Sequence, residues 1–346
     1  MSPVRWFRRW LRGDTRSPRD VDTAVRKALR SVLEGDLDAA EDLLSRAVRI
    51  DSDQVDAYLS LARLYRLRGE IGRAIRVHQN LLLRKDLRSE HRDEALLGLA
   101  GDFRKGGFLQ RSIAAYEELL ARRPGDQNAL RALARLRADV RDYRRALELQ
   151  RQLIRSEGRD GRAEEAQLLV EMAEAAHAEG KSDDARRALR RALRKDPRCV
   201  RAWIQLGTLE AERGRSKRAL VAWRKVPELD RRSGAEVYQR LEASYAAIGR
   251  AREFEDYLRQ LLEARAGDVD ASLALARALS ARGETDAAVA ELRAVLERDA
   301  ENLQAHAVLS RVLLAEGSEA DAVKELGELV EVLERSGVLE KREFTG

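Results

Sequence analysis

The sequence is poor in cysteine. Cys199 is the only one among 346 residues. One thiol excludes an internal disulfide and a four-cysteine zinc site, and such sparse use of cysteine is typical of a reducing compartment. Cys199 falls between two repeated units, where we expect it to be an inert structural thiol.

Long apolar runs are also missing. No stretch approaches the roughly 18 to 20 apolar residues that a membrane-spanning helix requires. The basic start of the chain is not followed by the long apolar run of a secretory signal. We therefore expect a cytoplasmic protein.

Catalytic and metal-binding patterns are scarce as well. The chain has four histidines, His78, His91, His177 and His306, each in a separate part of the sequence and without a nearby partner. Gly180, Lys181 and Ser182 resemble the end of a phosphate-binding loop, but Ala175 stands where its first glycine should be. We expect no enzyme activity, no cofactor and no metal site, and we interpret His78 as a core imidazole.

The sequence carries no recognised nucleic-acid module. Six of its 66 basic and two of its 60 acidic residues lie in the first twenty positions, which leaves 60 against 58 in the remainder. This balance is nearly neutral, so the pI of about 9.5 does not by itself indicate nucleic-acid binding.

What the chain does contain is an internal repeat of about 34 residues, which predicts nine helix-turn-helix units. A turn glycine is followed five residues later by a small residue, because glycine can end the first helix in a left-handed conformation and a small side chain lets the second helix pack closely. The pairs are Gly35/Ala40, Gly69/Ala74, Gly107/Ser112, Gly180/Ala185, Gly214/Ala219, Gly283/Ala288 and Gly317/Ala322, with degenerate versions at Arg141/Ala146 and Gly249/Phe254.

Large apolar residues recur in the same phase, which predicts two amphipathic helices in each unit. We expect them to form the core and not a ligand site. On first helices they are Tyr58, Leu61, Tyr65, Trp203, Leu206, Tyr238, Leu241 and Tyr245, and on second helices Leu44, Tyr116, Leu189, Trp223, Leu258, Leu292 and Leu326. Pro124 and Pro197 fall where a second helix must end.

This pattern resembles the tetratricopeptide repeat over roughly residues 21–336, and Trp203, Leu206, Gly207, Gly214 and Ala219 give the closest single match. The resemblance implies an all-α solenoid, a right-handed superhelix with a concave surface for protein partners. We therefore expect a basic aromatic segment with its linker at 1–20, the solenoid at 21–336 and a tail at 337–346.

The first twelve residues differ from the rest in combining aromatic rings with arginines. If this segment is helical, its aromatic and leucine side chains share a face and its arginines meet anionic headgroups, which is typical of an interfacial membrane contact. Docking onto a protein partner and a basic disordered arm remain alternatives. The residues concerned are Arg5, Trp6, Phe7, Arg8, Arg9, Trp10, Leu11 and Arg12.

A second resemblance is more specific. The stretch RGEIGRAIRVHQ at 68–79, the longer interval between Gly69 and Gly107 and the aromatic Phe254 in place of alanine resemble the lipopolysaccharide assembly protein B family. That family opens with a transmembrane helix and ends in a rubredoxin-like metal module. We expect this chain to lack both, either through truncation or because the relative has lost the module.

The resemblance to this bacterial family implies an adaptor at the cytoplasmic face of the inner membrane. Such proteins restrain lipopolysaccharide synthesis by bringing the lipid A deacetylase to a membrane AAA+ protease. Two alternatives remain: a general repeat scaffold for an unrelated soluble assembly, and a regulatory subunit of an enzyme.

The tetratricopeptide resemblance also implies which residues face the groove. In units two to four, the inward positions of the first helices carry Arg63, Arg66, Arg104, Arg131 and Arg135. Clustered arginines favour an acidic peptide or a carboxylate-rich protein surface. The alternative is that these arginines are solvated and paired with glutamates of adjacent helices.

Overall fold

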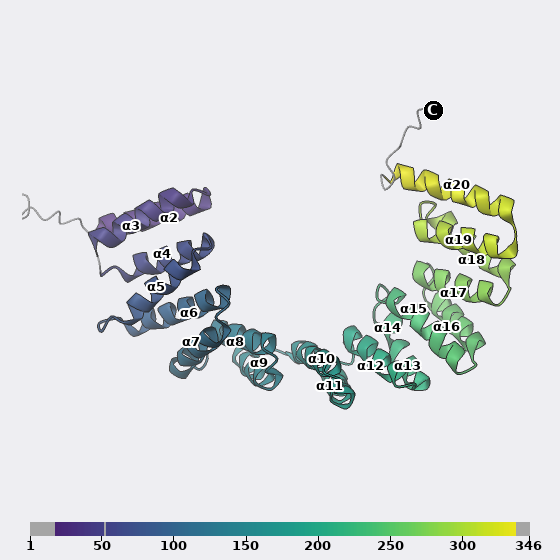
Figure 1. Cartoon of the computed structure of the whole chain (residues 1–346), viewed down its shortest axis with the longest axis horizontal. Helices are drawn as coiled ribbons and strands as arrows, with labels where there is room; N and C mark the ends of the chain where they lie inside the picture. The colour runs from purple at the N-terminus through teal and green to yellow at the C-terminus, as the bar shows by residue number, and fades with distance from the viewer. Residues whose placement is uncertain (1–17, 52, 337–346) are drawn as a thin grey trace, which may run out of the picture. The chain divides into compact units, whose positions relative to one another are not determined.

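The computed structural model describes residues 18–51 and 53–336, with side chains from residue 23 onward, and these residues form helices and no strand. The chain divides into two compact units, residues 1–161 and 162–346. In each unit the helices follow one another in chain order (Figure 1). Between residues 18 and 336, no helix is both long and apolar enough to cross a membrane.

The first unit is built from four described hairpins. Within each hairpin the two helices pack on each other, and the first three second helices each pack on the first helix of the following hairpin. The hairpins are α2 (Pro18–Leu33) with α3 (Leu37–Ile50), α4 (Val55–Leu67) with α5 (Ile71–Leu82), α6 (Ser89–Lys105) with α7 (Leu109–Arg122), and α8 (Gln127–Asp139) with α9 (Tyr143–Glu157).

The second unit contains five described hairpins. One second helix is interrupted near Pro227, because proline has no backbone N–H to continue the helical hydrogen bonds. The hairpins are α10 (Arg162–Ala178) with α11 (Ser182–Lys195), α12 (Val200–Glu212) with α13 (Ser216–Trp223) and α14 (Lys225–Leu229), α15 (Ala235–Ala247) with α16 (Ala251–Ala264), α17 (Val269–Ala281) with α18 (Thr285–Arg298), and α19 (Leu303–Glu316) with α20 (Glu319–Arg335).

The turns confirm the predicted repeat phase. All eight predicted turn glycines have a positive φ, and Arg141, in the degenerate unit, has a φ of 63°. Arg141 is the one non-glycine residue with positive φ in the described part of the chain. The small residues five positions after these turns are at most 1% exposed, and so is Phe254, whose ring lies 5.8 Å from that of Tyr245. The phase therefore marks the points where the paired helices come closest.

The predicted core is confirmed with one exception. Most of the predicted large apolar side chains are buried, while Tyr58 and Trp203 are half-buried. Leu326 is 40% exposed, so its prediction as a core residue was wrong. It lies on α20, the last described helix, against which the described residues place no further hairpin. The second helices α7 and α11 end just before Pro124 and Pro197, as predicted.

Replacing Arg141 with glycine is expected to stabilise the chain. A left-handed φ costs a non-glycine residue about 1–2 kcal/mol, which exceeds the entropic cost of glycine. Arg141 also takes part in polar or electrostatic contacts, so Arg141→Ala is the matched control that removes the side chain and keeps the strain. Chemical denaturation should find Arg141→Gly more stable than Arg141→Ala by about 1 kcal/mol. Equal stability would mean that the turn at 141 stores no strain.

Candidate functional site

The structure places all five predicted groove arginines on first helices of the first unit: Arg63 and Arg66 on α4, Arg104 on α6, and Arg131 and Arg135 on α8. Helices α4 and α6 contact each other directly. We call the surface formed by successive first helices in one unit the first-helix face. The amino-terminal residues 5–12, predicted to contact a membrane surface, lie outside the described residues.

Three of these arginines form ion pairs at the protein surface. Arg63 contacts Glu94 on the next first helix, and Arg104 Nη2 lies 3.6 Å from Asp139 Oδ2. Arg131 Nη2 lies 2.5 Å from Glu157 Oε1. All three arginines are exposed, so water screens these pairs and each is worth at most about 1 kcal/mol. A partner can therefore compete for these guanidinium groups at a small cost.

Arg66 is held by a buried network. Its Nε lies 3.3 Å from Asp102 Oδ1, and Asp102 Oδ2 lies 2.6 Å from His78 Nδ1. His78 and Asp102 are almost fully buried, which confirms the prediction of His78 as a core imidazole. A Cβ on Gly98 would lie 2.3 Å from His78 Nε2, so the network needs the close approach that glycine allows. Arg66 is thus positioned by the core.

Arg135 is the free cation of the five. It is exposed and makes no hydrogen bond or ion pair with any residue that the structure describes. The predicted basic face therefore consists of one free arginine, one held by the core and three in weak surface pairs. Its role in binding a partner stays a prediction.

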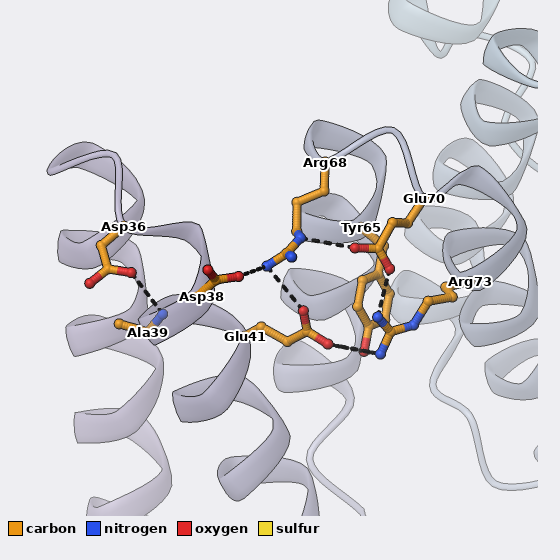
Figure 2. Close-up of polar contacts among 8 residues, drawn as sticks. All are labelled: Asp36, Asp38, Ala39, Glu41, Tyr65, Arg68, Glu70 and Arg73. Carbon is orange, nitrogen blue, oxygen red and sulfur yellow. Dashed lines mark hydrogen bonds and ion pairs between the residues drawn. The ribbon is translucent and has the colours of Figure 1, made fainter.

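The segment 68–79, which carries the more specific resemblance, contains a charged network between the first two hairpins (Figure 2). Arg68 contacts Asp38 and Glu41 on α3, with Nη1–oxygen distances of 2.5 and 3.2 Å, and Glu70 at 2.9 Å from its Nε. Arg73 contacts Glu70 at 2.6 Å and Glu41 at 2.8 Å. These residues join α3 to the turn of the next hairpin, so this part of the segment has a structural role.

Tyr65 completes this network. Its hydroxyl accepts a hydrogen bond of 2.7 Å from Arg73, whose guanidinium carbon lies 3.9 Å from the ring centroid. Burial, and then the nearby Glu41 carboxylate, raise the pKa of Tyr65 above its ordinary value. The phenol therefore stays neutral and bridges the acidic and basic members (Figure 2).

The contact made by Arg68 recurs in the second unit. The residue before the turn glycine is also arginine at Arg213 and Arg282, and each reaches an acid on the preceding second helix. Arg213 lies 2.6 Å from Asp183 on α11, and Arg282 lies 2.5 Å from Glu255 on α16. Glu255 is only 2% exposed, and Arg282 makes the shorter of its two ion pairs, the other being with Arg259 at 3.7 Å.

A polar hollow on the first-helix face of the second unit was missed by the sequence analysis. It has a volume of about 410 Å³ and is lined from α15, α17 and α19, chiefly by Tyr238, Gln239, Asp270, Arg277, Gln304 and Arg311. Helix α17 contacts both α15 and α19. Arg277 and Arg311 stand six residues before Gly283 and Gly317, as Arg63 and Arg135 stand before Gly69 and Arg141. Extending the groove positions to the last two units would have found them.

Two further predicted features concern Cys199 and His306. Cys199 is buried, and burial raises the pKa of its thiol, which fits an inert structural residue.

His306, Glu325 and Glu328 are the one set of three metal-capable side chains found together in the described part of the chain. Both ring nitrogens of His306 have protein partners: Nδ1 lies 2.5 Å from Glu325 and Nε2 lies 3.0 Å from the Ala300 carbonyl. We interpret this group as an ion pair that closes the last hairpin.

Comparison with known proteins confirms the predicted repeat. Family models described as tetratricopeptide repeat match residues 31–93, 170–225 and 249–312, together more than half of the chain. A fragment of MamA from Desulfovibrio magneticus is a similar solved structure, with 19% identity, coverage of 52% of this chain and 96% of that one, and a TM-score of 0.37.

The similarity to the lipopolysaccharide assembly protein B family is also confirmed. The Escherichia coli K12 protein of that name is 28% identical over 257 residues, which cover 74% of this chain and 66% of the relative. The Haemophilus influenzae protein is 28% identical over 282 residues, which cover 79% of this chain and 70% of the relative. The chain thus spans slightly less than two thirds of the length of the Escherichia coli relative.

The contribution of His306 to stability should depend on pH. Burial opposes its protonation, but the hydrogen bond with the Ala300 carbonyl and the contact with Glu325 outweigh burial and raise the pKa of His306. A raised folded-state pKa gives stability that is fully present below the unfolded value of about 6.5 and is lost as the pH rises through the folded value.

We therefore expect His306→Gln to destabilise the chain more at about pH 5.5 than at about pH 9, by on the order of 1 kcal/mol. Denaturant titrations at both pH values measure this difference. Glu325→Gln is the matched control, because removing the carboxylate should make the effect of His306→Gln less dependent on pH. An effect that is the same at both pH values in the wild-type background would contradict the ion pair.

Proposed function

This chain belongs to the tetratricopeptide-repeat family, and we propose that it is a non-enzymatic adaptor that binds protein partners on its first-helix faces. The observation that carries this proposal is the similarity to the two assembly proteins over about three quarters of the chain. The arrangement of the helices agrees with it, because several successive first helices contact one another, such as α4 with α6 and α15 with α17, and present charged side chains outward. Such a face binds a partner without any chemical step.

The name of the relatives gives the biological setting of the proposal. We propose that the adaptor acts in the control of lipopolysaccharide or envelope synthesis at the cytoplasmic face of the inner membrane. In this role it presents a client enzyme, the lipid A deacetylase, to a membrane AAA+ protease. A general scaffold for an unrelated soluble assembly is the alternative, and the recovered partners distinguish the two.

Arginines of the first unit supply the proposed partner contact. Arg135 has a free guanidinium, Arg66 is fixed by Asp102, and Arg63, Arg104 and Arg131 sit in surface pairs that a partner can replace. Guanidinium groups bind carboxylates with two parallel hydrogen bonds, which favours an acidic partner surface. Because the surface pairs are weak, exchange of one carboxylate for another costs little.

The amino-terminal segment is proposed to add a reversible membrane contact. Residues Arg5 to Arg12 combine three aromatic rings with four arginines. Aromatic side chains favour the headgroup boundary and arginines favour anionic lipids, but one short helix binds only weakly. The segment would raise the local concentration of the adaptor near a membrane partner.

Charge reversal on the first-helix face should weaken partner binding. After crosslinking in native cells, we expect the wild-type chain to recover the membrane protease or the deacetylase. The triple variant Arg63→Glu, Arg104→Glu and Arg135→Glu should recover at least about fivefold less, because the reversed charges repel an acidic surface. Mass spectrometry of the co-purified proteins is the measurement.

The matched control reverses three exposed arginines on second helices, Arg46, Arg76 and Arg144. This control has the same change in net charge and should keep the partners. Recovery of soluble partners alone would favour the general scaffold. Equal loss in both triple variants would assign the effect to net charge and contradict a role for the first-helix face.

The aromatic rings of the amino-terminal segment are expected to drive its membrane contact. Trp6→Ala with Trp10→Ala should lower binding to vesicles containing anionic phospholipid by about tenfold or more, because the two rings supply most of the apolar area. Vesicle co-sedimentation of the full chain measures this. Binding of the wild type to vesicles of zwitterionic lipid alone is measured as well. The difference from the anionic vesicles gives the contribution of the arginines. Undiminished binding of the double variant would reject the interfacial contact.

A further inference from the structure

The polar hollow of the second unit holds an arginine without a partner. Arg277 of α17 is half-buried, and its Nε is buried with no hydrogen-bond acceptor among the described residues. Its guanidinium also forms no ion pair within the described part of the chain. A buried donor that makes no hydrogen bond costs free energy, because it has lost its water and gained nothing in exchange. Folding of the chain alone does not explain this arrangement.

The charges around Arg277 act on it in both directions, and none of the nearby acids forms an ion pair with it. Burial lowers the pKa of Arg277, and the neighbouring Arg311 of α19 lowers it further. Glu242 and Asp270 act in the opposite direction, but neither comes within ion-pair distance. Arg311 is exposed at the edge of the hollow and likewise has no ion pair or hydrogen bond with the described residues. Two arginines thus line one hollow together with Asp270, and neither forms an ion pair with a residue that the structure describes.

The same repeat position is satisfied differently in the first unit. Arg63 is the counterpart of Arg277, six residues before its turn, and it contacts Glu94 on the next first helix. The residue of α19 that corresponds to Glu94 of α6 does not supply a carboxylate to Arg277, because the side chains of α19 at the hollow are Gln304, Ala307, Val308 and Arg311. Arg277 in the second unit therefore lacks the acid on the next first helix that Glu94 provides for Arg63 in the first unit.

The two carboxylates near the hollow limit the charge that it can accept. Burial is the main cause that raises the pKa of both Asp270 and Glu242. Their negative charges offset the positive charges of the two arginines. Asp270 and Glu242 would therefore repel a dianionic phosphate more strongly than a carboxylate, which has a single charge. Gln239 and Gln304 also line the hollow, and their amides can both donate and accept hydrogen bonds. These groups suit the backbone of a peptide.

We propose that this hollow receives an aspartate or glutamate side chain of a protein partner, which inserts between Arg277 and Arg311. The carboxylate forms two hydrogen bonds with the Arg277 guanidinium, and the amides of Gln239 and Gln304 contact the backbone of the same acidic segment. This inference rests on the proposed function, because it assumes that the partner of the chain is a protein. It adds the location and the chemistry of one contact.

The test uses the full chain and four pools of fluorescent eight-residue peptides with blocked ends. Each pool fixes one central residue, which is glutamate, glutamine, phosphoserine or lysine. Fluorescence polarisation should find the glutamate pool bound most tightly. Arg277→Gln should weaken its binding by about thirtyfold and Arg311→Gln by less, because a half-buried cation contributes more than an exposed one. Arg277→Lys should be intermediate, since it keeps the charge and loses the paired hydrogen bonds.

Arg293→Gln is the matched control. Arg293 is exposed on the second helix α18, outside the hollow, and makes no ion pair with a residue that the structure describes. This variant should bind the glutamate pool as the wild type does. Equal binding of the glutamate and glutamine pools, tighter binding of the phosphoserine pool, or equal losses in Arg277→Gln and Arg293→Gln would each overturn the proposal.

Stability provides a second measurement that does not depend on the peptides. If Arg277 serves to bind a ligand and does not support the fold, the Arg277→Met variant should unfold at the same or a higher denaturant concentration than the wild type. The substitution removes a half-buried charge that has no ion pair among the described residues. A clear loss of stability would show that the arginine supports the fold and would overturn the proposal.

Failure of this inference and failure of the proposed function give different results. If Arg277→Gln still co-purifies with the partners of the wild type and shows no loss of peptide binding, the adaptor stands and the hollow is not its contact. If the wild type recovers no protein partner, yet the glutamate pool binds in a manner that depends on Arg277, the hollow stands and the adaptor function fails.

Discussion

A single helical hairpin cannot bury both of its apolar faces, and the rest of the structure follows from this constraint. Within each unit, each second helix must pack on its own first helix and, where another hairpin of the same unit follows, on that hairpin too. The closest approach is set by Ala40, Ala74 and their equivalents, which are at most 1% exposed. A larger side chain there requires compensation, as at Phe254, which packs against Tyr245. Stability is therefore a sum over neighbouring units, and the outward side chains are free to vary.

Ion pairs between hairpins refine this packing without creating it. Arg68, Arg213 and Arg282 each connect a turn to the preceding second helix, and each is a little over a quarter exposed. Where the acid is also exposed, as at Asp38 and Asp183, such a pair contributes little. Where the acid is buried, as at Glu255, loss of the arginine would leave the carboxylate with only the longer contact of 3.7 Å to Arg259. The same arginine position thus ranges from an accessory contact to a structural requirement.

Local rules were sufficient to predict the hairpins, since turn glycines, small residues and apolar spacing act over a few residues. They placed the left-handed turn at Arg141 and the buried His78 correctly. They failed for Leu326, because its burial requires a further helix and not a local pattern. Pairing of Arg63 with Glu94, 31 residues away, also depends on how two helices face each other. The hollow around Arg277 combines three first helices, so composition alone does not reveal it.

One repeat position connects stability with binding. Arginine occurs six residues before the turn at Arg63, Arg135, Arg277 and Arg311, and nothing in the hairpin itself requires it there. The next first helix neutralises Arg63 with Glu94. The other three arginines have no such acid among the described residues, and their free guanidinium groups raise the cost of folding in proportion to their burial. Arg135 and Arg311 are exposed and bear little of that cost. Arg277 is half-buried, so its unpaired guanidinium has the largest free-energy cost on folding of the three. It is therefore the strongest candidate for a contact that only a partner completes.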